Sequence, residues 1–246
     1  MSEKDTIYRD DALQPDRFRF DDRVVRVFPD MIRRSVPGYG LIVPSIALLA
    51  RRHVQAGSRI YDLGCSLGAV SFAILDGLGF EEAELIAVDN SAEMVEAFRR
   101  LLDEHATGGG RRMPVHVERA DVLELAIENA SVVVLNFTLQ FIDPEQRDGL
   151  LQRIAEGMRP GGLLVLSEKV VFGDAGEQDR QSGWHLDFKR AQGYSDLEIS
   201  RKRDALEQTL RPESMEMHLD RLRRAGFAEA YCWFRCFNFA SIAAIR

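Results

Sequence analysis

Two short segments of the chain carry residues whose types and spacing suit the binding of a nucleoside ligand. Residues 61–70 read YDLGCSLGAV, an apolar run that breaks into a turn flanked by Gly64 and Gly68 and continues at helical spacing. The glycines let a ligand approach the backbone, and a helix that begins there presents unpaired N–H groups to it. Asp89 follows 25 residues after Gly64, where an acid ending the next strand typically holds a ribose diol. Alternatively, Asp89 caps the helix that begins at Ser91, and one carboxylate can serve both ends.

Two further polar positions follow predicted strands. Asp121 comes directly after residues 115–119, where a carboxylate can accept from an adenine amino group while Val122 offers its backbone N–H to the ring. The alternative for Asp121 is an exposed loop acid. Asn136 ends the apolar run 131–135, at the edge where open parallel sheets place their ligands.

A third candidate lies in the long segment 170–210. Residues 195–198 read SDLE, a capping box that opens a helix. On that helix Arg203 lies beside an apolar stripe that contains Ile199 and Leu206, so its guanidinium suits an anionic partner. The alternative is that Arg203 binds no ligand: its aliphatic stem packs along the helix and its guanidinium stays in solvent. Four neighbours are expected to be structural or solvated: Trp184, His185, Lys189 and Arg190.

These residues need a scaffold of alternating strands and helices, and the apolar periodicity predicts one. Such alternation predicts a parallel sheet covered by helices on both faces. The strands are predicted at 59–63, 84–88, 115–119, 131–137 and 162–168, and the helices at 67–77, 91–105 and 144–158.

Two additions to this scaffold are predicted within a single domain, 1–246. Residues 1–55 form a helical cap, whose apolar recurrence is interrupted by Pro29 and by the turn at Pro37 and Gly38. Residues 170–210 are too long for a simple connection, and we expect them to form a lid or substrate module.

Composition excludes several classes of protein. The net charge of −7 and the pI near 5.4 argue against a broad basic surface for nucleic acid. The three cysteines form no disulfide framework and no Cys/His cluster has zinc spacing, so a reducing cytoplasm and no metal are expected. The sequence has no apolar run of about 18 residues, and the protein is expected to be soluble.

The motif D-x-G-x-S-x-G at residues 62–68 resembles the S-adenosylmethionine (SAM) motif of class I methyltransferases more than the dinucleotide motif G-x-G-x-x-G. The end of the chain is similar as well, because a helix at 212–225 precedes two strands within 230–245, joined near Asn238. The resemblance implies a Rossmann-like α/β fold with a seven-stranded, mostly parallel sheet and an antiparallel last strand. The residues after Asn136, FTLQ, differ from the N-P-P-Y of many base-modifying methyltransferases, which argues against methylation of a flipped base.

Nearly the whole chain resembles one family, the carboxy-SAM synthases of bacterial tRNA wobble-uridine modification. Departures are confined to 107–112 and 173–183. The resemblance rests on VFPDMIRRSVPGY (27–39), YDLGCSLGAV (61–70), AVDNSAEM (87–94), IENASVVVLNFTLQF (127–141), LSEK (166–169), DFKRAQGYSDLEISRKR (187–203) and WFRCFNFAS (233–241).

The resemblance implies carboxyl transfer rather than methyl transfer. Members of this family convert SAM to carboxy-SAM with prephenate as the carboxyl donor and release phenylpyruvate. Their product supplies a separate enzyme that makes 5-carboxymethoxyuridine in tRNA. The family mechanism requires no protein base, and the sequence shows no His or Glu convincingly placed to remove a methyl proton. A homodimer is implied, with no direct contact to nucleic acid or membrane.

The resemblance also implies roles for individual residues. Arg203 matches the arginine that binds the new carboxylate, and its side chain is a candidate to reach the neighbouring subunit's site. A closed apolar pocket is expected to draw on Phe137, Phe141, Phe237 and Phe239. The candidates to hold the carboxylates of prephenate are Arg33, Arg34, Lys169 and Arg190. The SAM site is implied to comprise Tyr39, Gly64, Cys65, Ser66, Asp89, Asn90, Asp121, Val122 and Asn136.

Two other functions fit the SAM motif by itself. One is an ordinary SAM-dependent methyltransferase that acts on a small molecule or on tRNA. The other is a SAM-binding module without catalytic activity. The ligand and its fate distinguish these alternatives from a carboxy-SAM synthase.

Overall fold

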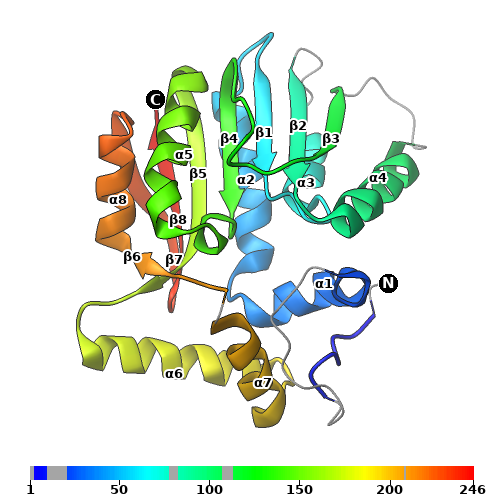
Figure 1. Ribbon diagram of the computed structural model, residues 1–246, viewed down its shortest axis with the longest axis vertical. Coiled ribbons are helices and arrows are strands. Elements are labelled where there is room, and N and C mark those ends of the chain that lie inside the picture. Colours follow the sequence, from blue (N-terminus) through cyan, green and yellow to red (C-terminus); the bar gives the residue numbers. More distant parts are fainter. Residues whose placement is uncertain (1–2, 10–20, 78–82, 107–112, 208) are drawn as a thin grey trace.

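A twisted sheet in the order β3-β2-β1-β4-β5-β8-β7 forms the centre of the computed structural model (Figure 1). The structure describes residues 3–9, 21–77, 83–106, 113–207 and 209–246. The strands are β1 (Arg59–Leu63), β2 (Glu84–Asp89), β3 (Val115–Arg119), β4 (Ala130–Asn136), β5 (Met158–Val171), β6 (Glu213–Ser214), β7 (Glu229–Cys236) and β8 (Phe239–Ile245). The helices are α1 (Asp22–Ser35), α2 (Tyr39–His53), α3 (Ala69–Gly77), α4 (Ala92–Ala106), α5 (Pro144–Gly157), α6 (Ala175–Ala191), α7 (Asp196–Glu207) and α8 (Met215–Arg224), with a short 3₁₀ turn at Leu139–Phe141.

The predicted sheet topology is confirmed. Strands β1 to β5 pair in parallel, and β8 is inserted antiparallel between β5 and β7. The terminal hairpin turns at Phe237 and Asn238, as expected. Strand β6 is an addition that the sequence did not predict: it pairs in parallel with the end of β5, which is longer than expected. The helix predicted at 212–225 therefore begins later, at Met215, where the Ser214 hydroxyl caps it.

Helices cover both faces of the sheet, so its strands are apolar on both sides. In β4 six consecutive residues are buried, and each buried valine there contributes about 1.5–3 kcal/mol relative to exposure. Helices α2, α3 and α4 pack on one face through Ile46, Ile74 and Phe98. Helices α5 and α8 pack on the other through Leu150 and Leu222. This three-layer packing fixes the strand ends that the predicted site requires.

The predicted interruption of the N-terminal cap at Pro29 is wrong, because α1 continues through it. Asp21 caps this helix by accepting from two backbone N–H groups, and Val24 and Met31 are buried against α4 and α7. This capping and packing offset the hydrogen bond that proline removes. The predicted turn before Tyr39 is confirmed: Gly38 has φ 79°, and a Cβ there would overlap the ring of Phe234.

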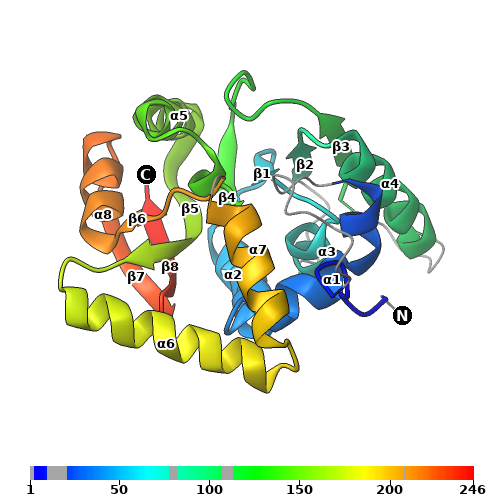
Figure 2. The same cartoon turned by 60° about the horizontal axis from the view of Figure 1, so that its bottom comes forward.

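Helices α1, α6 and α7 gather at the side of the sheet where β1 and β4 end (Figures 1 and 2). The predicted capping box opens α7: Ser195 N donates to Glu198 Oε2 (2.8 Å), and Glu198 N donates to Ser195 Oγ (3.3 Å). A buried polar cluster joins these helices to residues 3–9. Tyr194 OH donates to Asp5 Oδ2 (2.5 Å), and Lys202 Nζ lies 3.4 Å from the same oxygen.

Among the described residues, no helix is both long enough and apolar enough to span a bilayer.

Candidate functional site

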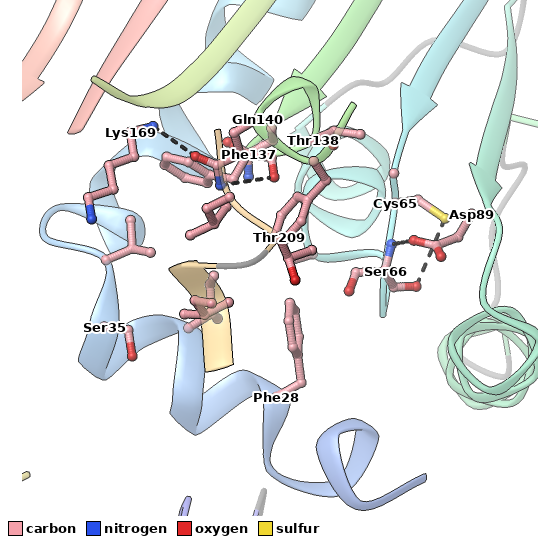
Figure 3. A pocket seen from close by; sticks show the side chains of 18 of the residues that line it. Phe28, Ser35, Cys65, Ser66, Asp89, Phe137, Thr138, Gln140, Lys169 and Thr209 are labelled. Carbon is pink, nitrogen blue, oxygen red and sulfur yellow. Dashed lines mark hydrogen bonds between the residues drawn. The ribbon is translucent and has the colours of Figure 1, made fainter. Parts of the chain in front are cut away.

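A cavity of about 600 Å³ lies between the carboxyl ends of β1, β2 and β4 and the helices α1, α6 and α7. Open parallel sheets bind ligands at this edge, and the volume is typical of a small-molecule site. Figure 3 shows Cys65, Ser66 and Asp89 on one side of the cavity and Lys169 on the opposite side. The other charged side chains that line it likewise come from different elements according to their sign.

The nine residues implied for the SAM site all line this cavity: Tyr39, Gly64, Cys65, Ser66, Asp89, Asn90, Asp121, Val122 and Asn136. They come from α2 and from the ends of four adjacent strands. Arg203, implied to bind the new carboxylate of carboxy-SAM, does not line the cavity in this chain. Its side chain is exposed on α7, and its Nε lies 3.8 Å from Asp204 Oδ1.

The turn after β1 is held by hydrogen bonds of its own backbone. Gly64 N and Cys65 N both donate to Val88 O, at 2.8 and 3.0 Å, and Ser66 N donates to Asp89 Oδ2 (2.9 Å). Because these three N–H groups are used within the protein, the turn offers a ligand its carbonyl oxygens, which suit the ammonium group of an amino acid. Gly64 has φ 79°, and a Cβ there would overlap the Thr138 side chain.

Asp89 contributes to the start of α4, as the alternative supposed, although the N-cap itself is Ser91, whose Oγ accepts from Met94 N (3.1 Å). Its Oδ1 accepts from Ser91 N (2.9 Å) and its Oδ2 from Ser66 N, so the carboxylate joins the glycine turn to the start of α4. Burial raises the pKa of Asp89, opposed by these hydrogen bonds. Each carboxylate oxygen has a second lone pair, so capping leaves acceptors for a ribose diol. The ribose role stays a prediction.

Backbone strain is concentrated in the wall of the cavity. Ser66 (φ 53°) and Phe137 (φ 63°) are two of the four non-glycine residues in the described ranges that have positive φ. Such conformations cost about 1–3 kcal/mol each and cluster at ligand sites. Phe137 follows Asn136, whose Oδ1 is buried without a hydrogen-bond partner among the described residues. A ligand that enters the cavity with a hydrogen-bond donor would supply the partner that this oxygen lacks.

Two residues that the sequence analysis did not list shape the same walls. Asp62, in β1, is buried, and its Oδ2 accepts from Ser71 Oγ (2.6 Å). Burial raises the pKa of Asp62 to about 6. Gln140 Nε2 donates to Phe137 O (3.3 Å), and its Oε1 accepts from Lys169 N (3.0 Å), which fixes the wall after β4 (Figure 3).

The charges that line the cavity fall into two groups. We call the first the acidic side, which consists of four aspartates. Asp62 lies in β1, Asp89 ends β2, Asp121 follows β3, and Asp143, which is ion-paired with Arg211 (2.8 Å), directly precedes α5. We call the second the basic side: it comes from α1, β5, α6 and α7 and consists of Arg33, Lys169, Lys189 and Lys202. A cationic ligand suits the first group and an anionic ligand suits the second.

Expectations for the basic residues are met only in part. Arg33 and Lys169 line the cavity as candidates for a carboxylate. Arg34 is instead buried, stacked 3.9 Å from the centre of the Tyr194 ring, and Arg190 is exposed and paired with two aspartates. Lys189, expected to be structural or solvated, lines the cavity and is buried. The sequence could have indicated Lys189 only through the scarcity of lysine in this chain.

His185 also lines the cavity, one turn before Lys189 on α6. Its Nε2 lies 2.9 Å from Ser35 O, a carbonyl that can only accept, so Nε2 carries the proton. Burial lowers the pKa of His185 to about 3, and the ring is neutral near pH 7. A neutral ring with so low a pKa is a poor general base.

Aromatic side chains close part of the cavity. Phe137, Phe141 and Phe239 line it as predicted, and the Phe137 and Phe239 rings meet edge to face with centroids 6.0 Å apart. Phe237 does not line it; its ring faces Trp184 at 6.2 Å. These rings exclude water from part of the site. In the part of the chain that the structure describes, no group of three or more His, Cys, Asp or Glu side chains is arranged to hold a metal ion.

Comparison with a family model and with solved structures supports the fold. Residues 60–162 match a family model described as a methyltransferase domain. An O-methyltransferase family protein from Burkholderia thailandensis superposes with a TM-score of 0.61 at 19% identity, over 92% of this chain and 60% of that one. A structure of PigF with SAH gives a TM-score of 0.56 at 21% identity, over 91% of this chain and 58% of that one. These likenesses show the class I SAM-methyltransferase fold.

Comparison with curated proteins is more specific. The carboxy-S-adenosyl-L-methionine synthase of Geobacter metallireducens is 54% identical over 98% of both chains. The synthase of the same name from Aeromonas salmonicida is 51% identical over 100% of this chain and 98% of its own. With identity at this level over nearly its full length, the chain belongs to the carboxy-S-adenosyl-L-methionine synthase family.

Proposed function

We propose that this protein makes carboxy-SAM from SAM and prephenate and releases phenylpyruvate. The observation that carries the proposal is the division of one cavity into an acidic side and a basic side. SAM has a sulfonium and an ammonium against one carboxylate, so it suits the acidic side. Prephenate has two carboxylates and suits the basic side. Family membership supports the same reaction.

In this proposal the sheet edge holds SAM. Asp89 accepts from the ribose hydroxyls, and Asp121 and the Val122 N–H contact the adenine. The carbonyls of the Gly64 turn, which includes Cys65 and Ser66, take the ammonium. Tyr39, Asn90 and Asn136 complete the site. The support is that all these residues line one cavity and that the buried Oδ1 of Asn136 has no partner among the described residues.

The reaction balances without a protein base. Loss of carbon dioxide from prephenate sends the electron pair of the broken C–C bond into the ring, which becomes aromatic and expels hydroxide. Hydroxide takes a proton from the SAM methyl and leaves as water. The resulting sulfonium ylide attacks carbon dioxide and forms the new C–C bond. The contribution of the protein is to hold both substrates together and to exclude bulk water, which the phenylalanines and the helices α6 and α7 support.

Arg203 is proposed to bind the new carboxylate from a neighbouring subunit. Its exposure outside its own cavity supports a role across a homodimer interface. Exposed large apolar side chains on α2 and β7, among them Leu41, Leu48 and Tyr231, are further support for a second copy. The affinity ratio between carboxy-SAM and SAM in an Arg203→Ala variant measures this role.

The wider setting is proposed from the same family. The product would pass to a separate enzyme that modifies the wobble uridine of tRNA, with both proteins in the cytoplasm. The segment 170–210 would act as a lid and residues 1–55 as a cap of a single domain. The three cysteines, none of them paired in a disulfide, fit a reducing compartment.

One incubation tests the proposed function. Purified protein is mixed with SAM and prephenate, and phenylpyruvate and the nucleoside products are followed together. The expected result is SAM-dependent phenylpyruvate release with an equal amount of carboxy-SAM. Release of phenylpyruvate at only the uncatalysed rate overturns the proposal. Accumulation of S-adenosylhomocysteine with a methylated product would instead identify a methyltransferase.

A further inference from the structure

Lysine is rare in this chain and concentrated in one place. Only four of the 32 basic residues are lysines, and three of the four, Lys169, Lys189 and Lys202, line the same cavity. The fourth, Lys4, is exposed and does not line the cavity. The chain therefore uses arginine almost everywhere that a surface cation is needed. Lysine differs from arginine because burial can remove its charge, whereas a guanidinium stays protonated.

The lysines of the cavity differ in their partners. Lys202 Nζ donates to Ser35 Oγ (2.8 Å) and lies 3.4 Å from Asp5 Oδ2, so its charge is balanced within the protein. Lys189 is 7% exposed, and its Nζ forms no hydrogen bond or ion pair with the described residues. This Nζ is not among the fully buried unpartnered atoms, so it reaches the space of the cavity. An amine buried in this way costs free energy when it is charged, unless an anion arrives to pair with it.

The groups that face Lys189 make its ammonium form still less favourable. Lys169 on β5 and Lys202 and Arg203 on α7 act on it with like charge, and Arg33 of α1 lines the same cavity. His185, on its own helix, is neutral near pH 7 and supplies no counter-charge. Burial, with these cations, lowers the pKa of Lys189 to about 7. The empty site thus holds a mixture of amine and ammonium near neutral pH.

We propose that Lys189 binds a carboxylate of the anionic second substrate and takes up a proton as that anion enters. The identity of the anion as prephenate rests on the proposed function, but the chemistry requires only an organic carboxylate. The bound anion supplies the missing partner, so the ammonium becomes the stable form. Protonation on binding gives the site a full charge when the substrate is present and reduces repulsion among the cations when it is absent.

Calorimetry on SAM-saturated protein tests the proton uptake, with phenylpyruvate as the probe. Titrations in two buffers of different ionisation enthalpy give the number of protons bound. At about pH 8, where the empty amine is mostly neutral, the wild type should take up a fraction of a proton, and this uptake should fall toward about pH 6. Equal uptake by Lys189→Met would overturn the proposal.

Affinity and kinetics supply a second readout. Lys189→Met should raise the KM for prephenate about tenfold or more, because one charge-assisted hydrogen bond is lost, and should change the KM for SAM by less than about twofold. Lys189→Arg should recover part of the affinity but none of the proton uptake, since arginine is always charged. Lys4→Met is the matched control and should change neither the KM for prephenate nor the proton uptake.

The two proposals fail in distinguishable ways. If wild-type protein binds phenylpyruvate with proton uptake but makes no carboxy-SAM from prephenate, the proposed function is wrong and the role of Lys189 stands. If the wild type makes carboxy-SAM while Lys189→Met keeps the wild-type KM for prephenate, the role of Lys189 is wrong. A melting curve and a SAM titration of each variant establish that it is folded; if Lys189→Met is not, the uptake measured with Lys189→Arg decides.

Discussion

The acidic and basic sides of the cavity are built in different ways. The acidic side consists of strand ends and the turns after them, and the Gly64 turn and Asp89 are fixed to each other by backbone hydrogen bonds. The basic side consists of side chains from four elements that meet only through tertiary packing, with Arg33 and Lys202 separated by most of the chain. The first belongs to the fold, and the proposed function assigns it to SAM. The second, carried by α1, β5, α6 and α7, is assigned to the compound that reacts with SAM.

Loss of Asp89 should have the largest effect, and it should be confined to the acidic side. Asp89→Ala removes the proposed ribose contacts and also the acceptors of Ser66 N and Ser91 N. Two charge-assisted hydrogen bonds correspond to about 3 kcal/mol or more, so SAM should bind about 100-fold more weakly or worse by equilibrium titration.

Asp220→Ala is the control for this measurement, because Asp220 forms an exposed ion pair with Arg223 on α8. It should leave SAM affinity unchanged. Wild-type affinity for SAM in the Asp89→Ala variant would contradict the assignment of the acidic side.

Loss of Arg203 should have a smaller effect that depends on the ligand. Arg203→Ala should keep its affinity for SAM and lose about tenfold in affinity for carboxy-SAM, since one carboxylate contact is missing. Competition between the two ligands gives this ratio directly. An unchanged ratio would rule out the carboxylate role.

A mixture of variants tests whether Arg203 acts between subunits. In a mixed dimer of Arg203→Ala and Asp89→Ala, one site combines an intact Asp89 with an intact Arg203 of the other subunit. Mixed dimers should therefore recover binding of carboxy-SAM with wild-type preference. No recovery in dimers shown to be mixed would mean that Arg203 acts only within its own chain.

The smallest effect at neutral pH is expected from His218, which lies outside both sides of the cavity. It is fully buried on α8, and neither ring nitrogen has a partner within the described ranges. Burial lowers the pKa of His218 to about 4, from an ordinary value of 6.5. Between these two pH values the histidine binds a proton in the unfolded chain but not in the folded chain. Wild-type stability should therefore fall between about pH 6.5 and pH 4, by up to about 1.4 kcal/mol per pH unit from this residue.

Denaturant unfolding of His218→Leu checks this slope. The variant should lack the part of the pH dependence that His218 contributes, while proton uptake on phenylpyruvate binding stays as in the wild type. His116→Leu, at an exposed position of β3, serves as the control. If His218→Leu and the wild type lose stability in parallel on acidification, the buried neutral state of His218 is wrong.

The sequence located the Gly64 turn and Asp89 but not Lys189 and Lys202, and the reason is physical. Gly64 and Asp89 belong to a strand–turn–helix unit whose spacing determines its geometry, so periodicity and turn chemistry locate it. Lys189 and Lys202 depend on how α6 and α7 fold back over the sheet, which no local pattern specifies. Pro29 shows the same limit, because packing of α1 against α4 and α7 outweighs a local helix-breaking signal.

The most direct test of the central claim follows the carboxyl group itself. Prephenate labelled with a heavy carbon isotope in its ring carboxylate is incubated with the protein and SAM, and the nucleoside product is analysed by mass spectrometry. The expected product is SAM in which one hydrogen of the methyl group is replaced by a carboxylate that carries the label. Recovery of unlabelled SAM, or of a carboxylated nucleoside without the label, would contradict it.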